Sequence, residues 1–364
     1  MGADSYARLA DALEALPGGF PRTPSGVELR LIRKAFTEEE VELAGQMTRT
    51  YESVEALVDR TGLPETRIRA LLQGLLPRAL VRSRVIDGEE RFRLGPFVVG
   101  WYEAAMLGPM RNDLEFAELF EQYMREGGGE RIMSPRPGVM GVVPVRGSVR
   151  KELLQPYDDI DAHFQRHERF AVLDCVCRLE RNLLGGTCSK PVTRCGFIGV
   201  PPQTPLSDHI LDRGQAEKLF SQLEEEGHVH TGFYGFIMGA ERPQFVGSCN
   251  CCSDCCGILQ AMNELGIAEG PQRSNYRAVH DEGTCTACGT CTTRCQVHAI
   301  VEGENGTPHV VREKCIGCGL CVTTCPSGAV QLEPVSQEEW FDVPSSFEEW
   351  EERRLEYLSQ MLRE

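Results

Sequence analysis

The sequence CTACGTCTTRC at residues 285–295 is repeated, with changes, as CIGCGLCVTTC at residues 315–325. Each copy carries four cysteines in the spacing C-x2-C-x2-C-x3-C, and Cys315 follows Cys285 by 30 residues. Three closely spaced thiolates on a tight loop can bind three irons of a cubane, while the fourth cysteine reaches the neighbouring cluster. The duplicated spacing therefore predicts a small module that holds two iron–sulfur clusters.

Zinc knuckles are the alternative for these eight cysteines. Zinc sites favour paired C-x2-C halves that are separated by a longer loop, whereas this array is a duplicated four-cysteine motif. The small residues Ala287, Gly289, Gly317 and Gly319 lie between the cysteines. They let backbone N–H groups approach sulfur atoms, and such hydrogen bonds tune the reduction potential. The pattern favours iron–sulfur clusters over zinc.

This segment resembles the bacterial dicluster ferredoxin domain. The resemblance implies two sets of cluster ligands: Cys285, Cys288, Cys291 and Cys325 for one [4Fe–4S] cluster, and Cys315, Cys318, Cys321 and Cys295 for the other. One position departs from the family's pattern. Pro326 follows Cys325 as the pattern requires, but Gln296 follows Cys295. We expect this departure to loosen the local turn beside the second cluster.

Nine further cysteines precede this module. They are Cys175, Cys177, Cys188 and Cys195 in one stretch, and Cys249, Cys251, Cys252, Cys255 and Cys256 in another. Soft thiolates select iron–sulfur clusters, and nine cysteines can supply eight ligands. We therefore predict one or two additional clusters, with ligands that spacing alone does not assign. Zinc bound by the first stretch, disulfides and buried free thiols are the alternatives.

The two cysteine-rich stretches read C-x-C-x10-C-x6-C and C-x-C-C-x2-C-C. Followed by a dicluster module, they resemble a family of multi-cluster iron–sulfur proteins from anaerobic bacteria, described as 4Fe-4S ferredoxin-type proteins. The resemblance spans most of the chain and implies electron transfer without indicating the partner.

The composition predicts a globular protein of two or three domains. The chain has 364 residues and 17 cysteines, all of them after residue 174, and a formal net charge of −16. The acidic balance disfavours non-specific binding to nucleic acid or anionic membranes. The N-terminal residues carry no secretory signal pattern, and no apolar stretch is long enough to span a membrane. We therefore expect a reducing, cytoplasmic location, where cysteines serve as metal ligands or redox groups.

The N-terminal half predicts helices followed by a hairpin. Capping signals at Thr37 and Ser53 and a proline at residue 64 open three helices, and Asp87-Gly88 is a hairpin turn signal. This order resembles a winged helix over residues 37–95. The resemblance rests on pattern alone. Its arginines would contact DNA in one interpretation and an acidic partner protein in the other, and the acidic chain favours the second.

The whole chain is assigned to the α+β class, with several domains. The expected divisions are a helical region at 1–130, a cysteine-rich middle domain at 131–277, the dicluster module at 278–335 and an acidic helical end at 336–364. Residues 131–160 are expected to be extended, as a linker or a wrapping segment, residues 161–173 to be a helix, and residues 228–239 to be a strand.

Four histidines could suggest a different metal site. His163 and His167 are one helical turn apart but lack the glutamate of a metalloprotease motif, so we expect a solvated helix face. His228 and His230 share one strand face, where a packed or hydrogen-bonded pair is expected. No P-loop, dinucleotide fingerprint or Ser/His/Asp order is present, so no catalytic residue is assigned.

Three functional hypotheses follow from the sequence. The first is a non-catalytic electron carrier, or an electron-transfer subunit of a larger oxidoreductase complex, with redox proteins as partners. The second is a redox-responsive regulator that uses the winged helix to bind DNA. The third is a reductase subunit in which one cluster keeps an open iron site for a substrate.

Overall fold

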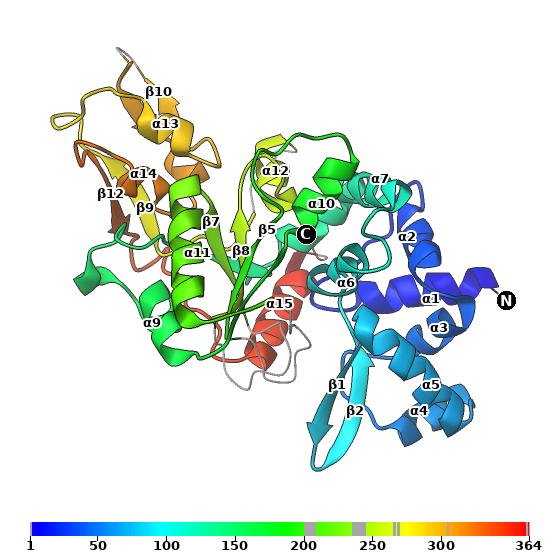
Figure 1. Ribbon diagram of the computed structural model, residues 1–364. Helices are drawn as coiled ribbons and strands as arrows, with labels where there is room; N and C mark the ends of the chain where they lie inside the picture. Colours follow the sequence, from blue (N-terminus) through cyan, green and yellow to red (C-terminus); the bar gives the residue numbers. More distant parts are fainter. Residues whose placement is uncertain are drawn as a thin grey trace. The chain divides into compact units, whose positions relative to one another are not determined.

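Helices and small sheets alternate along the chain in the computed structural model, which describes residues 2–199, 209–234, 245–264, 267, 270–303, 306–361 and 363 (Figure 1). This mixture agrees with the predicted α+β class. The chain forms two compact units, made of residues 1–135, 179–186 and 354–364 and of residues 136–178 and 187–353. Within the described residues, no helix has the length and apolarity needed to cross a membrane.

The first unit is mainly helical. Its elements are α1 (Gly2–Glu14), α2 (Val27–Ala35), α3 (Glu38–Ala44), α4 (Val54–Thr61), α5 (Glu65–Leu75), β1 (Val81–Ile86), β2 (Glu89–Leu94), α6 (Tyr102–Leu107), α7 (Leu114–Tyr123) and α8 (Gly129–Met133). Aromatic side chains fill its core, where Phe97 contacts Phe20 and Trp101. The burial of these large apolar rings supplies the main stabilisation of the unit.

Local signals in the sequence set the helix ends and the hairpin of this unit. Thr37 and Glu40 form the expected capping box at the start of α3, and Ser53 caps α4. Asp87 and Gly88 both have positive φ, so β1 and β2 pair through the tight turn that Asp-Gly favours. The predicted order of three helices and a hairpin is present, while the winged-helix resemblance stays a prediction.

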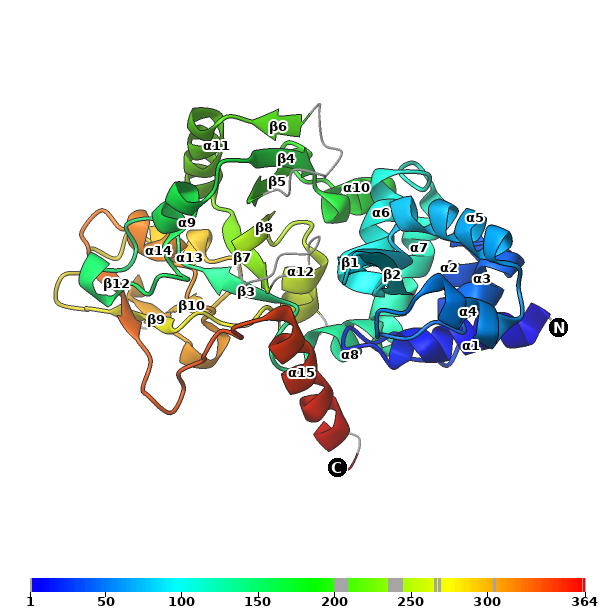
Figure 2. The same ribbon diagram turned by 90° about the horizontal axis from the view of Figure 1, so that it is seen from below.

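The second unit is built from small antiparallel sheets and short helices. One sheet has the order β3 (Met140–Val143), β7 (Val229–Tyr234), β8 (Phe245–Cys251), and another has the order β5 (Thr193–Ile198), β4 (Phe170–Asp174), β6 (Ile210–Leu211). Two ribbons complete the strands, namely β9 (Tyr276–His280) with β12 (Val330–Pro334), and β10 (Ile300–Glu302) with β11 (Pro308–Val310). Its helices include α9 (Ile160–Arg166), α11 (Arg213–Glu226), α12 (Gly257–Glu264), α13 (Thr290–Arg294) and α14 (Leu320–Thr323) (Figure 2). Helices α10 (Val176–Leu183) and α15 (Phe347–Met361) have residues in both units.

Two sequence expectations in the second unit are wrong. The segment 131–160 is not a simple linker, because it contributes the fully buried strand β3. The segment 161–173 is not one helix, because α9 ends at Arg166 and β4 begins at Phe170. In both cases pairing with distant strands overrides the local pattern. The strand expected at 228–239 is present as β7, and its residues 235–239 lie outside the described residues.

The C-terminal helix is confirmed as α15. Trp350 is fully buried, and its Nε1 donates to the Gly138 carbonyl at 2.9 Å. Residues 362 and 364 of the expected helical end lie outside the described residues. The predicted boundaries at residues 130 and 277 stay predictions, and the dicluster module shares its compact unit with residues 136–178 and 187–277.

His163 is not on a solvated face as we expected. Its side chain is 3% exposed, and its Nε2 lies 2.7 Å from the Tyr157 carbonyl oxygen. It packs on α9 next to Phe164, which belongs to a core cluster with Phe170. Burial, opposed by the hydrogen bond to Tyr157, lowers the pKa of His163 from 6.5 to about 4. His167, in contrast, is only partly buried.

A pH dependence of stability follows from this burial. The unfolded chain protonates His163 below about pH 6.5, whereas the folded chain stays neutral down to about pH 4, so acidification through this window favours unfolding. The expected loss is roughly 3 kcal/mol at the acid end. Urea unfolding of His163→Gln and wild type at pH 7 and pH 4.5 measures it, with His209→Gln, a change at an exposed histidine, as the control. Equal pH slopes in His163→Gln and wild type would contradict the assignment.

Candidate metal centres

Four cysteines from both repeats line one cavity. These four are Cys295, Cys315, Cys318 and Cys321. Cys315 and Cys321 are buried, and apolar side chains such as Ile316 complete the lining. These are the four residues that the resemblance implies for one cluster. We call this space the inner cavity.

The other four cysteines line a second cavity. Cys285, Cys288, Cys291 and Cys325 surround about 280 Å³. This space is at the surface, because Cys288 is exposed and Cys285 is only partly buried. The set again matches the ligands that the resemblance implies, and we call this space the outer cavity. In each set, the distant fourth cysteine comes from the other repeat.

Glycines and short helices bring the thiols to these cavities. Gly289 and Gly319 have positive φ just before α13 and α14, which carry Cys291 and Cys321. Gly317 also has positive φ, and a Cβ there would fall within 2.2 Å of the Tyr276 carbonyl oxygen. A residue with a side chain would not fit this close approach of two backbones.

Backbone N–H groups point at the cysteine sulfurs, as the small residues of the loops predicted. The N–H of Ala287 donates to Cys285 Sγ at 3.3 Å, and that of Ala278 donates to Cys315 Sγ at 3.4 Å. Donors of this kind stabilise negative charge on sulfur and raise the reduction potential of a bound cluster. Two cavities, each with four soft ligands and such donors, fit iron–sulfur clusters.

Comparison with protein families agrees with this geometry. Residues 278–332 match the family model of the 4Fe-4S dicluster domain. This segment is a dicluster ferredoxin-type domain. The match covers the C-terminal cysteine module and leaves the rest of the chain unassigned. A search of curated proteins found no match to the chain.

The inner cavity of the dicluster domain is covered by the preceding part of the second unit. The N–H of Val145 donates to the Cys318 carbonyl at 3.0 Å, and Ser274 donates to Ile316 and Gly317 through its N–H and hydroxyl. Burial raises the pKa of the Cys318 thiol to about 12. The two cavities therefore differ in environment, with the outer one open to solvent and the inner one enclosed.

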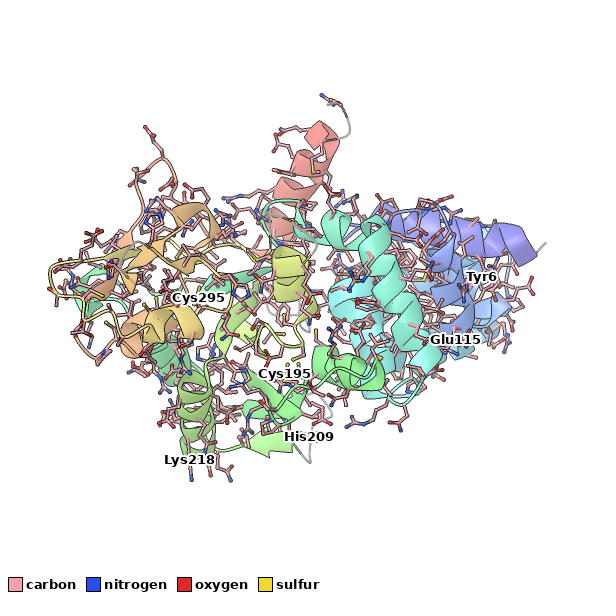
Figure 3. The ribbon with its side chains drawn as sticks, turned by 90° about the horizontal axis from the view of Figure 1, so that it is seen from above. Tyr6, Glu115, Cys195, His209, Lys218 and Cys295 are labelled. Carbon is pink, nitrogen blue, oxygen red and sulfur yellow. The ribbon has the colours of Figure 1, made fainter. Side chains whose placement is uncertain are left out.

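The other nine cysteines converge on one place, which we call the nine-cysteine site. Strands and helices of the second unit deliver them: Cys195 lies on β5, Cys249 and Cys251 on β8, Cys175 and Cys177 at the start of α10, and Cys188, Cys252, Cys255 and Cys256 in loops. Figure 3 labels Cys195 in this site and Cys295 in the dicluster domain. All 17 cysteines of the chain are free thiols, so the structure contains none of the disulfides considered above.

Six of the nine thiols are side-chain neighbours that follow one another in a closed ring. The order is Cys175, Cys177, Cys256, Cys251, Cys249, Cys195 and back to Cys175. Hydrogen bonds from neighbouring thiols lower the pKa of Cys175 and of Cys256 well below the ordinary value. Thiolate is the form that binds metal.

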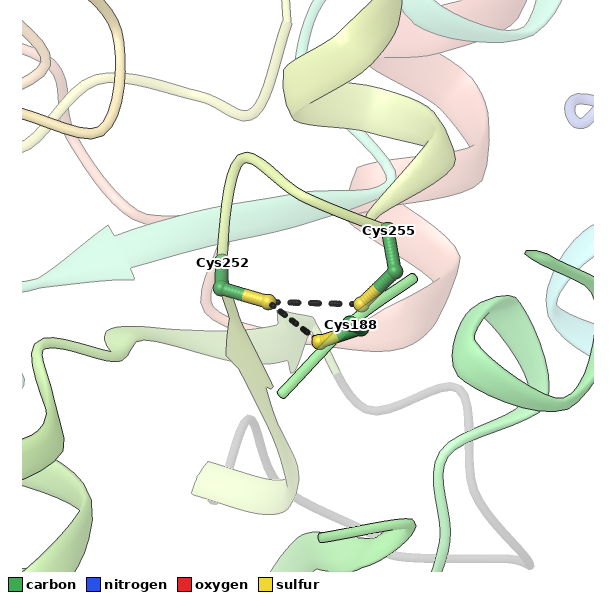
Figure 4. Close-up of side chains that lie close together, drawn as sticks. All are labelled: Cys188, Cys252 and Cys255. Carbon is green, nitrogen blue, oxygen red and sulfur yellow. Dashed lines mark hydrogen bonds between the residues drawn. The ribbon is translucent and has the colours of Figure 1, made fainter. Parts of the chain in front are cut away.

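The remaining three thiols form a compact triad. Cys252 Sγ lies 3.3 Å from Cys255 Sγ and 3.9 Å from Cys188 Sγ (Figure 4). All three sulfurs lie within 4.8 Å of one another, and Cys255 also hydrogen-bonds Cys175 of the ring. The nine thiols are thus one continuous group rather than two separate motifs.

Arg178 is a charged partner of the triad that sequence reasoning missed. It is fully buried, donates from Nη2 to Cys252 Sγ at 3.4 Å, and is held by the Pro191 carbonyl. A hydrogen bond from Cys255, opposed by burial and supported by Arg178, lowers the pKa of Cys252 to about 6. In the sequence, the one indication that Arg178 belongs to the site is its position directly after Cys177. A buried arginine requires anionic neighbours, which indicates thiolates here.

Polar residues between β7 and β8 hold the backbone of the site. His230 Nδ1 lies 2.6 Å from Asn250 Oδ1, and His228 Nδ1 lies 2.8 Å from the Asn250 carbonyl oxygen. Asn250 Nδ2 also donates to the Arg194 carbonyl on β5 at 2.9 Å. The expectation of a packed, hydrogen-bonded histidine pair is confirmed. Asn250 thereby fixes the strand that carries Cys249 and Cys251.

Proposed function

We propose that this protein is an electron-transfer protein that passes single electrons through two [4Fe–4S] clusters to one or two further metal centres in the nine-cysteine site. The observation that carries the proposal is the pair of four-cysteine cavities in the dicluster domain. Bound clusters would supply reversible one-electron chemistry there. The protein residues supply ligands, N–H donors to sulfur and, at the inner cavity, exclusion of water.

The nine-cysteine site supports an extension of the redox chain. Its buried thiols offer only soft ligands, and Arg178 compensates negative charge on them. Arg178 and the charge of the whole chain have opposite effects on the reduction potential. The positive charge of Arg178 raises it, whereas the formal charge of −16 disfavours the addition of an electron and lowers it.

Zinc is the second candidate for part of this site. A tetrahedral zinc with Zn–S bonds of about 2.3 Å places its sulfurs about 3.8 Å apart. The Cys188–Cys252 separation of 3.9 Å is close to this value. The triad alone supplies three ligands, which is the number that a cluster with an open iron site requires. This number is compatible with the reductase-subunit hypothesis.

We propose that the N-terminal helices and hairpin dock a redox partner rather than DNA. The arginines of the proposed recognition helix carry glutamate partners: Arg67 pairs with Glu39, Arg69 with Glu65 and Arg78 with Glu40. These pairs reduce the positive charge that phosphates would meet. The regulator hypothesis predicts a cluster-dependent, salt-sensitive shift of promoter DNA, and a protein-docking unit predicts none.

The metal content of anaerobically purified protein tests the proposal. The dicluster domain alone accounts for about eight irons and eight acid-labile sulfides per chain. We expect additional iron and sulfide, reaching about sixteen of each if the nine-cysteine site holds two more cubanes. Eight irons together with zinc would restrict the redox chain to the dicluster domain. Fewer than eight irons, without spectroscopic evidence of two cubanes, would contradict the electron-transfer function itself.

A further inference from the structure

The side chain of Gln296 contacts the loop of the nine-cysteine site from the dicluster domain. Gln296 follows Cys295, a residue of the inner cavity. Its Oε1 accepts hydrogen bonds from the N–H of Ser253 at 2.9 Å and from the Ser253 hydroxyl at 3.1 Å. Ser253 directly follows Cys252 of the triad. A path of covalent bonds and a single hydrogen bond therefore connects the sulfurs of Cys295 and Cys252.

Neighbouring residues hold Gln296 in this position. Asn263 Nδ2 on α12 donates to the Gln296 carbonyl at 3.0 Å. On the other side, Arg294 Nη2 donates to the Glu225 carbonyl at 2.7 Å, at the end of α11. These bonds hold the backbone on both sides of the junction, and the Gln296 side chain itself donates from Nε2 to the Arg294 carbonyl at 3.4 Å. A fixed donor–acceptor pair keeps one geometry, which a flexible surface contact would not do.

The internal repeat shows what is special about this position. The offset of 30 residues that relates the two copies places Pro326 opposite Gln296. Pro326 is exposed and has no side chain that could accept a hydrogen bond. The chain therefore has a hydrogen-bond acceptor in place of proline in the copy whose fourth cysteine lines the inner cavity. Gln296, which we expected to loosen the local turn, makes a contact with Ser253.

We infer that Gln296 is the positioning residue that couples the inner cavity electronically to the nine-cysteine site. This inference rests on the proposed electron-transfer function. Electron tunnelling is faster along covalent and hydrogen bonds than across van der Waals gaps, so the Gln296–Ser253 bond defines the favoured route. The exposed Cys288 makes the outer cavity the place where an external partner exchanges electrons. The chain then orders its sites from outer cavity to inner cavity to nine-cysteine site.

The test compares variants that keep or remove the acceptor. Gln296→Met has nearly the same length but only a weak acceptor, whereas Gln296→Glu keeps an oxygen for both Ser253 donors. Asn263→Ala is the matched control, because it removes a neighbouring hydrogen bond of the same junction and leaves the route intact. Electrons are injected by photoreduced deazaflavin, and rapid freeze-quench EPR follows their arrival at the nine-cysteine site.

The expected result is specific to the acceptor. Gln296→Met should slow electron arrival at the nine-cysteine site relative to wild type, because the hydrogen bonds from Ser253 to the Oε1 atom are lost. Iron content and midpoint potentials should stay at wild-type values, and both Gln296→Glu and Asn263→Ala should transfer at nearly the wild-type rate. A structural disturbance would change the iron content and the midpoint potentials as well as the rate. Measuring all three therefore separates a disturbance from a loss of the route.

Two results would overturn the inference and are distinguishable. An unchanged rate in Gln296→Met, with electrons still arriving, would remove the role of Gln296 and leave the proposed redox chain intact. Failure of electrons to reach the nine-cysteine site in the wild-type protein would remove both the inference and the extension of the chain. In that case the two clusters of the dicluster domain would still be reduced.

Discussion

The double variant Cys252→Ala/Cys255→Ala is expected to lose the metal of the triad while the dicluster domain keeps about eight irons. Cys252 and Cys255 supply two of the three triad sulfurs, and Cys252 is the thiol that Arg178 contacts. Removal of both leaves Cys188 without a second ligand within the triad. Arg178 would also lose two anionic neighbours while Cys175 remains beside it, so we expect a lower free energy of unfolding as well.

Metal analysis and EPR of the anaerobic protein measure this effect. Asp254→Ala is the matched control, because Asp254 lies in the same loop but is exposed and offers no thiol. We expect its metal content and unfolding midpoint to equal those of the wild type. A double variant with unchanged iron and zinc would show that the triad binds no metal, and the buried-thiol alternative would then hold for these residues.

The same residues show how far the sequence could predict the sites. The two sets of four cysteines in the dicluster domain follow from short spacing and a single repeat offset, so local pattern and resemblance suffice to group them. Contacts in the nine-cysteine site join Cys188 to Cys252, which are 64 residues apart. Such a pair depends on how β4, β5, β7 and β8 align. The spacing of the cysteines along the chain does not indicate the register between distant strands.

Buried polar residues were the harder part of the prediction. His163 looked like a surface residue because its helix is short and rich in charged residues, but the strand β4 that follows folds a core around it. Arg178 belonged to no motif, and Gln296 was visible only as a departure from the dicluster pattern. Their roles come from single hydrogen bonds to residues far along the chain, at Cys252 and Ser253. Periodicity reports which faces are apolar and carries no information on such pairs.

Equivalent cysteines of the two repeats are expected to give different phenotypes. Cys288 and Cys318 occupy the same motif position, yet Cys288 is exposed at the outer cavity while the backbone of Cys318 is bound by Val145. Cys288→Ala and Cys318→Ala should each lose about four irons per chain. Only Cys318→Ala should also lower the unfolding midpoint of the second unit, because the inner cavity is enclosed by its core, and metal binding there is coupled to folding.

Reduction by a protein donor separates the two variants further. If the outer cavity is where partners exchange electrons, Cys288→Ala should slow reduction of the remaining centres by a small reduced ferredoxin. Cys318→Ala should keep fast reduction of the outer cluster and block further passage to the nine-cysteine site. Fast passage in Cys318→Ala, with the inner cluster absent by EPR, would show that electrons bypass the inner cavity. The order of the chain, and with it the role of Gln296, would then be wrong.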